Sequence, residues 1–133
     1  AETHYQQAVE QPVSDRCKLA AYTNWGSLLQ ERGELLRART LFETTITIDP
    51  GFAIGYFNLG LTLKTLGDLP AAVASYEKAL QLQPDYADAY QNLGVVLLKL
   101  GNLTASVAAF RQAIALHRQQ GSPEAERLQQ ALT

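Results

Sequence analysis

Residues 53–86 read AIGYFNLGLTLKTLGDLPAAVASYEKALQLQPDY, and this stretch decides the fold. Apolar residues recur at helical spacing on both sides of Gly67, which predicts two helices, over 53–66 and 70–82. Gly67 suits the left-handed residue that ends a helix, and Pro70 suits the first turn of the next helix. The stretch therefore predicts a helical hairpin.

The hairpin occurs three times, and we assign repeats to residues 19–52, 53–86 and 87–120. The second and third copies are identical at 14 of 34 positions, which is more than unrelated hairpins would share. One hairpin cannot bury both of its faces, so the copies must stack. The recurring residues are a tyrosine, an asparagine and two glycines: Tyr22, Tyr56 and Tyr90; Asn24, Asn58 and Asn92; Gly26, Gly60 and Gly94; Gly33, Gly67 and Gly101.

These repeats resemble the tetratricopeptide-repeat (TPR) family. That family has an aromatic residue early in its first helix, small residues where the helices cross, a second aromatic residue in its second helix and a proline near its end. The second repeat matches with Tyr56, Gly60, Ala72, Tyr76, Ala79 and Pro84. The resemblance implies an all-α fold, a right-handed α-solenoid of helix-turn-helix hairpins.

Two residues depart from the family pattern. Thr45 stands where a smaller residue is usual, and we expect it to loosen the packing of its helix. Arg118 stands where proline is usual, so we expect the last repeat helix to continue toward Gly121.

We treat residues 1–133 as a single domain, and expect it to be part of a longer protein. Residues 1–18 include a phrase similar to the end of a second helix, so we assign them to the remnant of a preceding repeat. Residues 121–133 are predicted to form a capping helix over the open end of the stack, with Ser122 as its N-cap.

Composition excludes several classes of function. The net charge of −2 gives no field that would attract nucleic acid. No apolar run approaches the ~20 residues of a membrane span, so we expect no membrane insertion. Cys17 is the only cysteine, which favours a reducing, cytoplasmic compartment.

No residues are arranged for catalysis or for a metal, so we predict a protein that is not an enzyme and has no cofactor. His4 and His117 have no histidine or cysteine at ligand spacing, and we expect both on helix surfaces. We expect Cys17 to be a partly buried structural thiol.

In the family, the first helix of each repeat lines a concave groove, and this resemblance places Asn24, Asn58 and Asn92 there. A carboxamide can donate to a peptide carbonyl and accept from a peptide N–H, so a row of them can hold a peptide backbone. Residues 88–94 read DAYQNLG, a phrase similar to one in the TPR region of O-linked N-acetylglucosamine transferases. The alternative is that these asparagines are family background that helps the repeats to pack.

The same transfer makes the groove of the second and third repeats apolar, with lysines at its rim. Exposed apolar surface of this kind marks a binding site for a peptide or helix, or an oligomer contact. The alternative is that the end of the chain or flanking repeats cover it. The predicted anchors are Phe57, Leu61, Val95 and Leu98, and the predicted rim residues are Lys64 and Lys99.

TPR domains that bind acidic chaperone tails have a carboxylate clamp of lysine, asparagine and arginine residues. This sequence has Thr23, Ser27, Asn58, Asp88 and Asn92 at those positions, and only Asn58 matches. We therefore predict no binding of chaperone tails.

Three functions remain. The leading hypothesis is a non-catalytic protein-interaction module or scaffold that binds a peptide or helix in its groove. The second is the substrate-docking part of a larger, glycosyltransferase-like enzyme. The third is a structural module that self-associates through a solenoid end or the groove.

Overall fold

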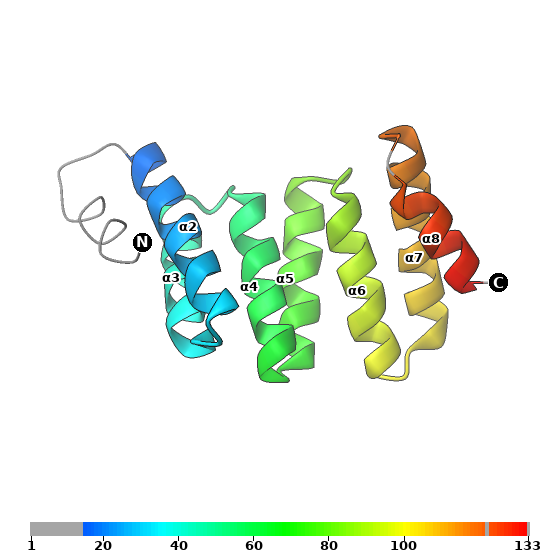
Figure 1. Cartoon of the computed structure of the whole chain (residues 1–133), viewed down its shortest axis with the longest axis horizontal. Helices are drawn as coiled ribbons and strands as arrows, with labels where there is room; N and C mark the ends of the chain where they lie inside the picture. The colour runs from blue at the N-terminus through cyan, green and yellow to red at the C-terminus, as the bar shows by residue number, and fades with distance from the viewer. Residues whose placement is uncertain (1–14, 122, 133) are drawn as a thin grey trace.

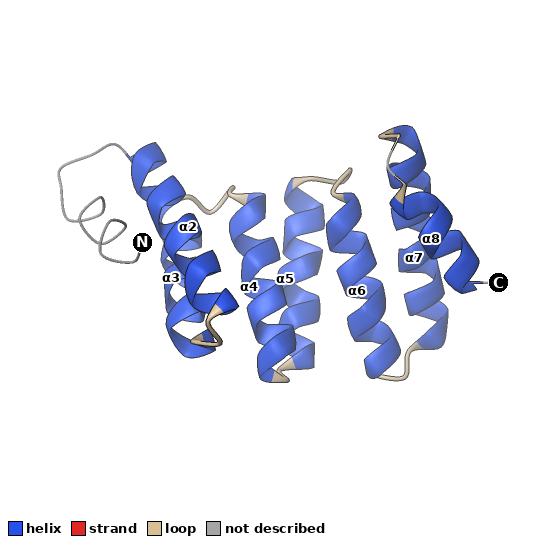
Figure 2. Cartoon of the chain, in the orientation of Figure 1, coloured by secondary structure: helices blue, strands red, loops and turns tan. Residues whose placement is uncertain are grey.

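Seven helices make up the part of the chain that the structure describes, residues 15–121 and 123–132. In this computed structural model the helices stand in one row, with α2 at the N-terminal end and α8 at the C-terminal end (Figure 1). Turns and short loops join them, and the described part has no strand (Figure 2). The helices are α2 (Asp15–Glu31), α3 (Leu35–Ile48), α4 (Ala53–Leu66), α5 (Leu69–Leu82), α6 (Ala87–Lys99), α7 (Leu103–Gln119) and α8 (Glu124–Leu132).

Helices that are neighbours in the sequence are neighbours in space. α2 packs on α3, α4 on α5 and α6 on α7, and these pairs pack on each other through α3 with α4 and α5 with α6. The first helices of the pairs also touch, α2 with α4 and α4 with α6, whereas α3, α5 and α7 do not contact one another. The row therefore curves toward α2, α4 and α6, and we call the surface that these three helices share the concave face. The predicted all-α solenoid with a C-terminal helix is confirmed.

Each hairpin is held by a glycine that faces an aromatic ring. A Cβ atom on Gly60 would lie 2.7 Å from Cε1 of Tyr76, closer than real carbon atoms approach. Only a residue without a side chain lets α4 and α5 come this near, which is why the recurring glycine is needed. The same pairing occurs between Gly26 and Phe42 and between Gly94 and Phe110.

The predicted turn at Gly67 is also present. Gly67 has a φ of 90°, in the left-handed region that suits glycine, and its N–H donates to the carbonyl of Lys64. Asp68 then caps α5, because its side chain accepts a hydrogen bond from the N–H of Ala71 at 3.4 Å. The hairpin reverses within two residues for this reason.

Thr45 does not loosen its helix, contrary to our expectation. Its side chain is fully buried, and its Oγ1 donates a hydrogen bond to the carbonyl of Phe42 at 2.6 Å. Gly55 in α4 provides the space, since a Cβ atom there would lie 2.7 Å from Thr45 Oγ1. The next interface has Ala79 and Ala89 at the corresponding positions. One interface thus pairs a larger side chain with glycine, whereas the other pairs two alanines.

The C-terminal end agrees with the prediction for Arg118. α7 has 17 residues against 14 in α5, and it ends just before Gly121, whose φ is 69°. α8 then packs on α7 and buries Ala125. The predicted N-cap, Ser122, lies outside the described residues.

The N-terminal end differs in its boundary. α2 begins at Asp15, so the range 1–18 overlaps it by residues 15–18, and residues 1–14 lie outside the described part. The carboxylate of Asp15 sits in the first turn, where it interacts favourably with the helix dipole. Cys17 is exposed rather than partly buried, contrary to our expectation.

We expect the Thr45–Gly55 pair to behave as one unit. Gly55→Ala should lower the free energy of unfolding by about 1–2 kcal/mol, because the new methyl group overlaps Thr45 Oγ1 and Ile46 Cγ2. Combining it with Thr45→Ala recreates the Ala79–Ala89 arrangement, so the double variant should lose less than the sum of the two single losses. Urea denaturation measures all three, and additive losses would show that the residues do not share one space.

Tyr76 gives a second stability prediction. Its hydroxyl is buried without a hydrogen-bond partner among the described residues, and burial raises the pKa of the phenol. Tyr76→Phe should therefore raise the free energy of unfolding by about 1 kcal/mol, because it removes an unsatisfied buried hydroxyl. Phe42→Tyr, at the matching position of the first repeat, is the control and should have the opposite sign. A loss of stability in Tyr76→Phe would contradict this account.

Candidate functional site

All nine residues predicted to bind a partner lie on the first helices, but they do not form one continuous surface. Their exposure varies widely, from half-buried Leu61 to Leu98, which is 51% exposed. Asn24 lies on α2. Phe57, Asn58, Leu61 and Lys64 lie on α4, and Asn92, Val95, Leu98 and Lys99 lie on α6.

The three asparagines of the predicted row are not equivalent. Asn24 is exposed, whereas Asn58 and Asn92 are half-buried. The Asn92 carboxamide is engaged at both ends, because Lys64 Nζ donates to its Oδ1 at 2.9 Å and its Nδ2 donates to the carbonyl of Asp88 at 2.9 Å. Sequence alone gave no sign of this contact, since Lys64 and Asn92 are in different repeats.

Lys64 lies in an unusual electrostatic setting. Partial burial lowers the pKa of its ammonium group, and the positive charge of Lys99 lowers it further. Within the part of the chain that the structure describes, neither lysine makes an ion pair with a carboxylate. The two predicted rim residues therefore concentrate positive charge at one end of the concave face.

A second polar contact joins the first helices one repeat earlier. The one hydroxyl hydrogen of Thr62 in α4 is shared between two acceptors, Gln30 Oε1 of α2 at 3.3 Å and the carbonyl of Asn58 at 3.0 Å. Gln30 and Lys64 occupy corresponding positions in their repeats. Side chains at this position therefore reach across to the next first helix and help to fix the spacing of the concave face.

Phe57 and Leu61 contribute to the packing of the solenoid as well as to its surface. Both pack against the hydrophobic core, and the Phe57 ring stacks on Tyr86 with centroids 4.9 Å apart and tilts against Tyr76 at 5.9 Å. Burial and the charge of Asp88 raise the pKa of Tyr86 to about 12. We expected Phe57 and Leu61 to be exposed, but both are half-buried, because they pack against the core beneath the surface that they also line.

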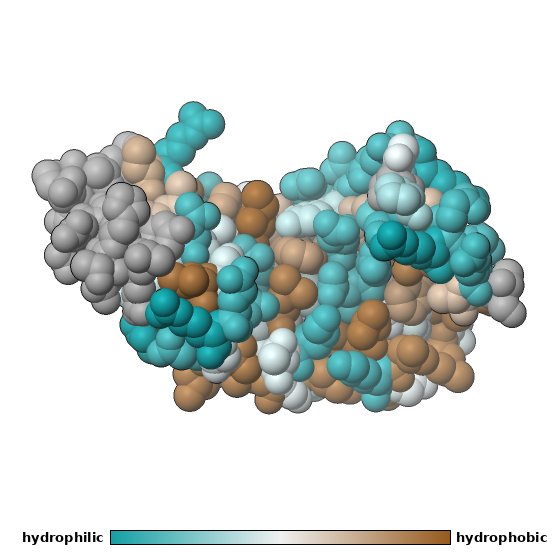
Figure 3. Space-filling view, in the orientation of Figure 1, coloured by the Kyte–Doolittle hydropathy of each residue, from teal (hydrophilic) through white to brown (hydrophobic). Residues whose placement is uncertain are grey.

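Leu98 belongs to a different surface. With Leu103, Phe110 and Leu128 it lines an apolar cavity of about 310 Å³ between α6, α7 and α8. Phe110 is half-buried there, whereas its counterparts Phe42 and Tyr76 are fully buried by the next repeat. In Figure 3 apolar residues gather along the edge of the molecule that holds the turns within the hairpins.

His117 is buried, contrary to our expectation of a surface residue. Its Nε2 lies 3.2 Å from Oε1 of Gln91 and 3.8 Å from Oδ1 of Asp88. The position follows from the extended α7, since His117 comes four residues after buried Ala113 and three after buried Ile114. That spacing was present in the sequence and could have predicted the burial.

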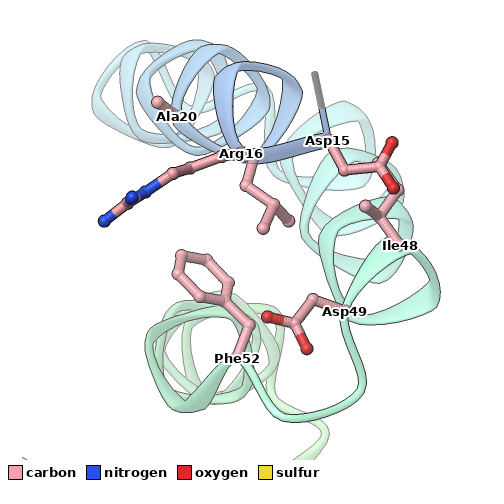
Figure 4. Close-up of a pocket in the computed structure, with 7 residues that line it drawn as sticks. Asp15, Arg16, Ala20, Ile48, Asp49 and Phe52 are labelled. Carbon is pink, nitrogen blue, oxygen red and sulfur yellow. The ribbon is translucent and has the colours of Figure 1, made fainter.

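A further cavity, of about 620 Å³, lies where α2 begins, beside the end of α3 and the start of α4. Figure 4 shows Phe52 pointing from the α4 side toward the first turn of α2, while Arg16 points away from Asp49. The Asp49 carboxylate accepts a hydrogen bond from the N–H of Gly51 at 2.9 Å. The sequence did not reveal this cavity, because residues 15–18 were assigned to a preceding helix.

In 15–121 and 123–132, no three histidine, cysteine, aspartate or glutamate residues lie close enough to hold a metal ion. None of the described helices combines the length and apolar character needed to cross a membrane.

Comparison with known proteins gives the family of the repeats. A TPR repeat model matches residues 63–101, and a tetratricopeptide repeat model matches residues 87–120, the bounds that we assigned to the third repeat. Residues 63–120 therefore match tetratricopeptide repeats. Such TPR units generally mediate protein–protein interaction. None of the curated proteins compared with the chain matches it.

Solved structures support the same fold. MamA is 25% identical with a TM-score of 0.74, over 77% of this chain and 60% of the MamA chain. The TPR2B domain of yeast Sti1, solved as a complex with pHsp70, is 19% identical with a TM-score of 0.81, over 85% of this chain and 91% of that chain. The MamA RS-1 ArsTM double mutant is 21% identical with a TM-score of 0.78, over 90% of this chain and 65% of that chain. This chain thus spans about three fifths of the MamA chain in the first of these matches.

The different exposures of Phe57 and Ile54 give a stability prediction. Phe57→Ala should lower the free energy of unfolding by about 2 kcal/mol, because it removes a half-buried ring and its stacking on Tyr86. Ile54→Ala, which truncates a side chain that is 44% exposed on the same helix, should change it by less than about 0.5 kcal/mol. Chemical denaturation compares the two, and an equally small loss in Phe57→Ala would show that the ring is not anchored in the fold.

Proposed function

We propose that the chain is a non-catalytic interaction module that binds an extended peptide along its concave face. The observation that supports this most is the row of carboxamides on α2, α4 and α6, the helices that contact one another along that face. Asn24, Asn58 and Asn92 would hold the peptide backbone, and Phe57, Leu61 and Val95 would contact its apolar side chains.

The helix spacing sets how such a peptide would pass the row. Packed helices lie roughly 8–10 Å apart. An extended peptide advances about 3.3 Å per residue, so successive asparagines would meet it about every third residue. The three amides would therefore span about seven residues of ligand. A bound helix advances only about 1.5 Å per residue and offers no free backbone N–H groups in its interior, so the carboxamides favour an extended ligand.

The likeness to the Sti1 domain supports the same proposal at the level of the fold, because that TPR domain was solved as a complex with pHsp70. Transfer to this chain stops there, since the two are 19% identical. The residues that form the carboxylate clamp elsewhere are also mostly different here. We propose a ligand other than a chaperone tail, bound in a cytoplasmic setting that the single cysteine favours.

A second candidate is the docking region of a larger, glycosyltransferase-like enzyme. It is favoured by the phrase DAYQNLG at residues 88–94, which includes Asn92 and Gly94. Both candidates use the same carboxamides, and they differ in what else the parent protein contains.

A third candidate is self-association, and the exposed apolar side chains Ile54 and Leu98 favour it. Light scattering of the chain and of Ile54→Glu separates it from ligand binding. A monomer in both cases keeps the concave face available for a peptide. A dimer that Ile54→Glu splits would mean that a second copy already occupies the face.

The binding proposal predicts a selective effect of Asn58→Ala. Peptides selected from a random library on the wild type should bind this variant about fivefold more weakly, the equivalent of one hydrogen bond of ~1 kcal/mol. Fluorescence anisotropy measures the affinity, and circular dichroism verifies the fold. Gln112→Ala, which removes an exposed carboxamide on α7, is the matched control and should bind as the wild type does. Equal affinities for Asn58→Ala and Gln112→Ala would contradict the proposed contact.

A further inference from the structure

The hydrogen bond between Lys64 and Asn92 blocks one position of the carboxamide row. Oδ1 of Asn92 accepts from Lys64 Nζ, and Nδ2 of Asn92 donates to the carbonyl of Asp88. Oδ1 has two lone pairs, so a peptide N–H that reaches Asn92 must share this oxygen with Lys64 or displace its ammonium group. Asn58 differs, because no such lysine is bonded to its carboxamide among the described residues.

Lys64 occupies a position that disfavours the charged form of its side chain. It is half-buried, and the charge of Lys99 repels it, so both effects lower the pKa of its ammonium group. An ammonium group has three donors, and the contact with Asn92 uses one of them. Two donors and an uncompensated charge remain for an anion.

No carboxylate of the described residues forms an ion pair with Lys64 or Lys99. Glu31 ends α2 at the same end of the stack, but it makes no ion pair with Lys64. Asp88 is in the first turn of α6 and Lys99 is its last residue. That separation is about 16 Å along the helix. Asn92, which Lys64 contacts, is only one turn from Asp88, but the Asp88 carboxylate lies 3.8 Å from His117 Nε2 and makes no ion pair with Lys64.

A simpler explanation is that both lysines only balance the negative ends of their helices, since each lies in a last turn. That explanation accounts for Lys99. It does not account for Lys64, whose Nζ is bonded to a side chain of α6 at 2.9 Å.

We propose that the peptide ligand has an acidic residue whose carboxylate binds between Lys64 and Lys99. The carboxylate replaces Oδ1 of Asn92 as the acceptor of the hydrogen bond from Lys64. Oδ1 of Asn92 then accepts a hydrogen bond from a peptide N–H. One acidic side chain thereby adds a charge-assisted contact and opens a backbone contact. This inference rests on the proposed function, and it adds the chemical class of the ligand.

The exchange explains how the face would select among peptides. A neutral peptide can offer Lys64 only carbonyl oxygens, so it does not neutralise the charge of the ammonium group. An acidic peptide adds the attraction between two opposite charges, which the contact of Lys64 with the neutral carboxamide of Asn92 does not have.

Selection from a random peptide library tests the proposal. The library has amidated C-termini, so that a terminal carboxylate cannot stand in for a side chain. It is passed over the immobilised wild type, Lys64→Ala, Lys99→Ala and the control Lys78→Ala, which removes a lysine of α5. Asp or Glu should be enriched at least about threefold at one position with the wild type and Lys78→Ala, and not with Lys64→Ala. Circular dichroism verifies that every variant is folded.

A pair of peptides then measures the exchange itself. One is the best acidic peptide from the selection, and the other has its acidic residue replaced by the neutral amide. Lys64→Ala should weaken the acidic peptide about tenfold, as expected for a hydrogen bond to a charged group. It should leave the neutral peptide unchanged or bound more tightly, because Asn92 is then free.

The outcomes distinguish failure of the inference about an acidic ligand from failure of the proposed function. Peptides that bind the wild type without acidic enrichment, or equal weakening of both peptides by Lys64→Ala, would overturn the inference while the proposed function stands. Failure to recover any peptide on the wild type would overturn both.

Discussion

The structure depends on the contact between a glycine and an aromatic ring within each hairpin. Gly60 and Tyr76 show it most clearly, because a single Cβ atom on the glycine would overlap the ring. The contact sets the distance between the two helices of a repeat. Since stacked repeats pack on one another through those helices, the same distance also sets how closely α2, α4 and α6 approach on the concave face.

The distance between the two helices of a repeat also decides which side chains are exposed on the concave face. Side chains of the first helix that point toward the second helix are partly buried. Phe57 packs against Tyr76 and Tyr86, and Gln91 lies within hydrogen-bond distance of His117. Side chains one step further around the first helix stay at least partly exposed, and these include exposed Asn24 and half-buried Asn58 and Asn92. Fold and candidate site thus share the same helices, which is why Phe57 contributes to both.

Much of the fold could be predicted from the sequence, because local signals determine it. The glycines that end helices, the helical spacing of apolar residues and the missing proline at Arg118 each act within a few residues. The exchange of volume between Thr45 and Gly55 and the bond from Lys64 to Asn92 could not be predicted, because they join side chains from different repeats. Their geometry depends on how the hairpins stack, which a repeat pattern does not specify. The burial of His117 lies between these cases, since its spacing from Ala113 was visible but its partner Gln91 was not.

The central claim is that a peptide binds on the concave face. The most direct test is a ¹H–¹⁵N titration of the labelled chain with the best peptide from the library selection. The account predicts that the shifted signals belong to α2, α4 and α6 and include the side-chain amides of Asn24, Asn58 and Asn92, with α3 and α5 nearly unchanged. Shifts confined to the cavity between α6, α7 and α8, around Leu103 and Leu128, would show that the partner binds the end of the solenoid and would contradict the claim.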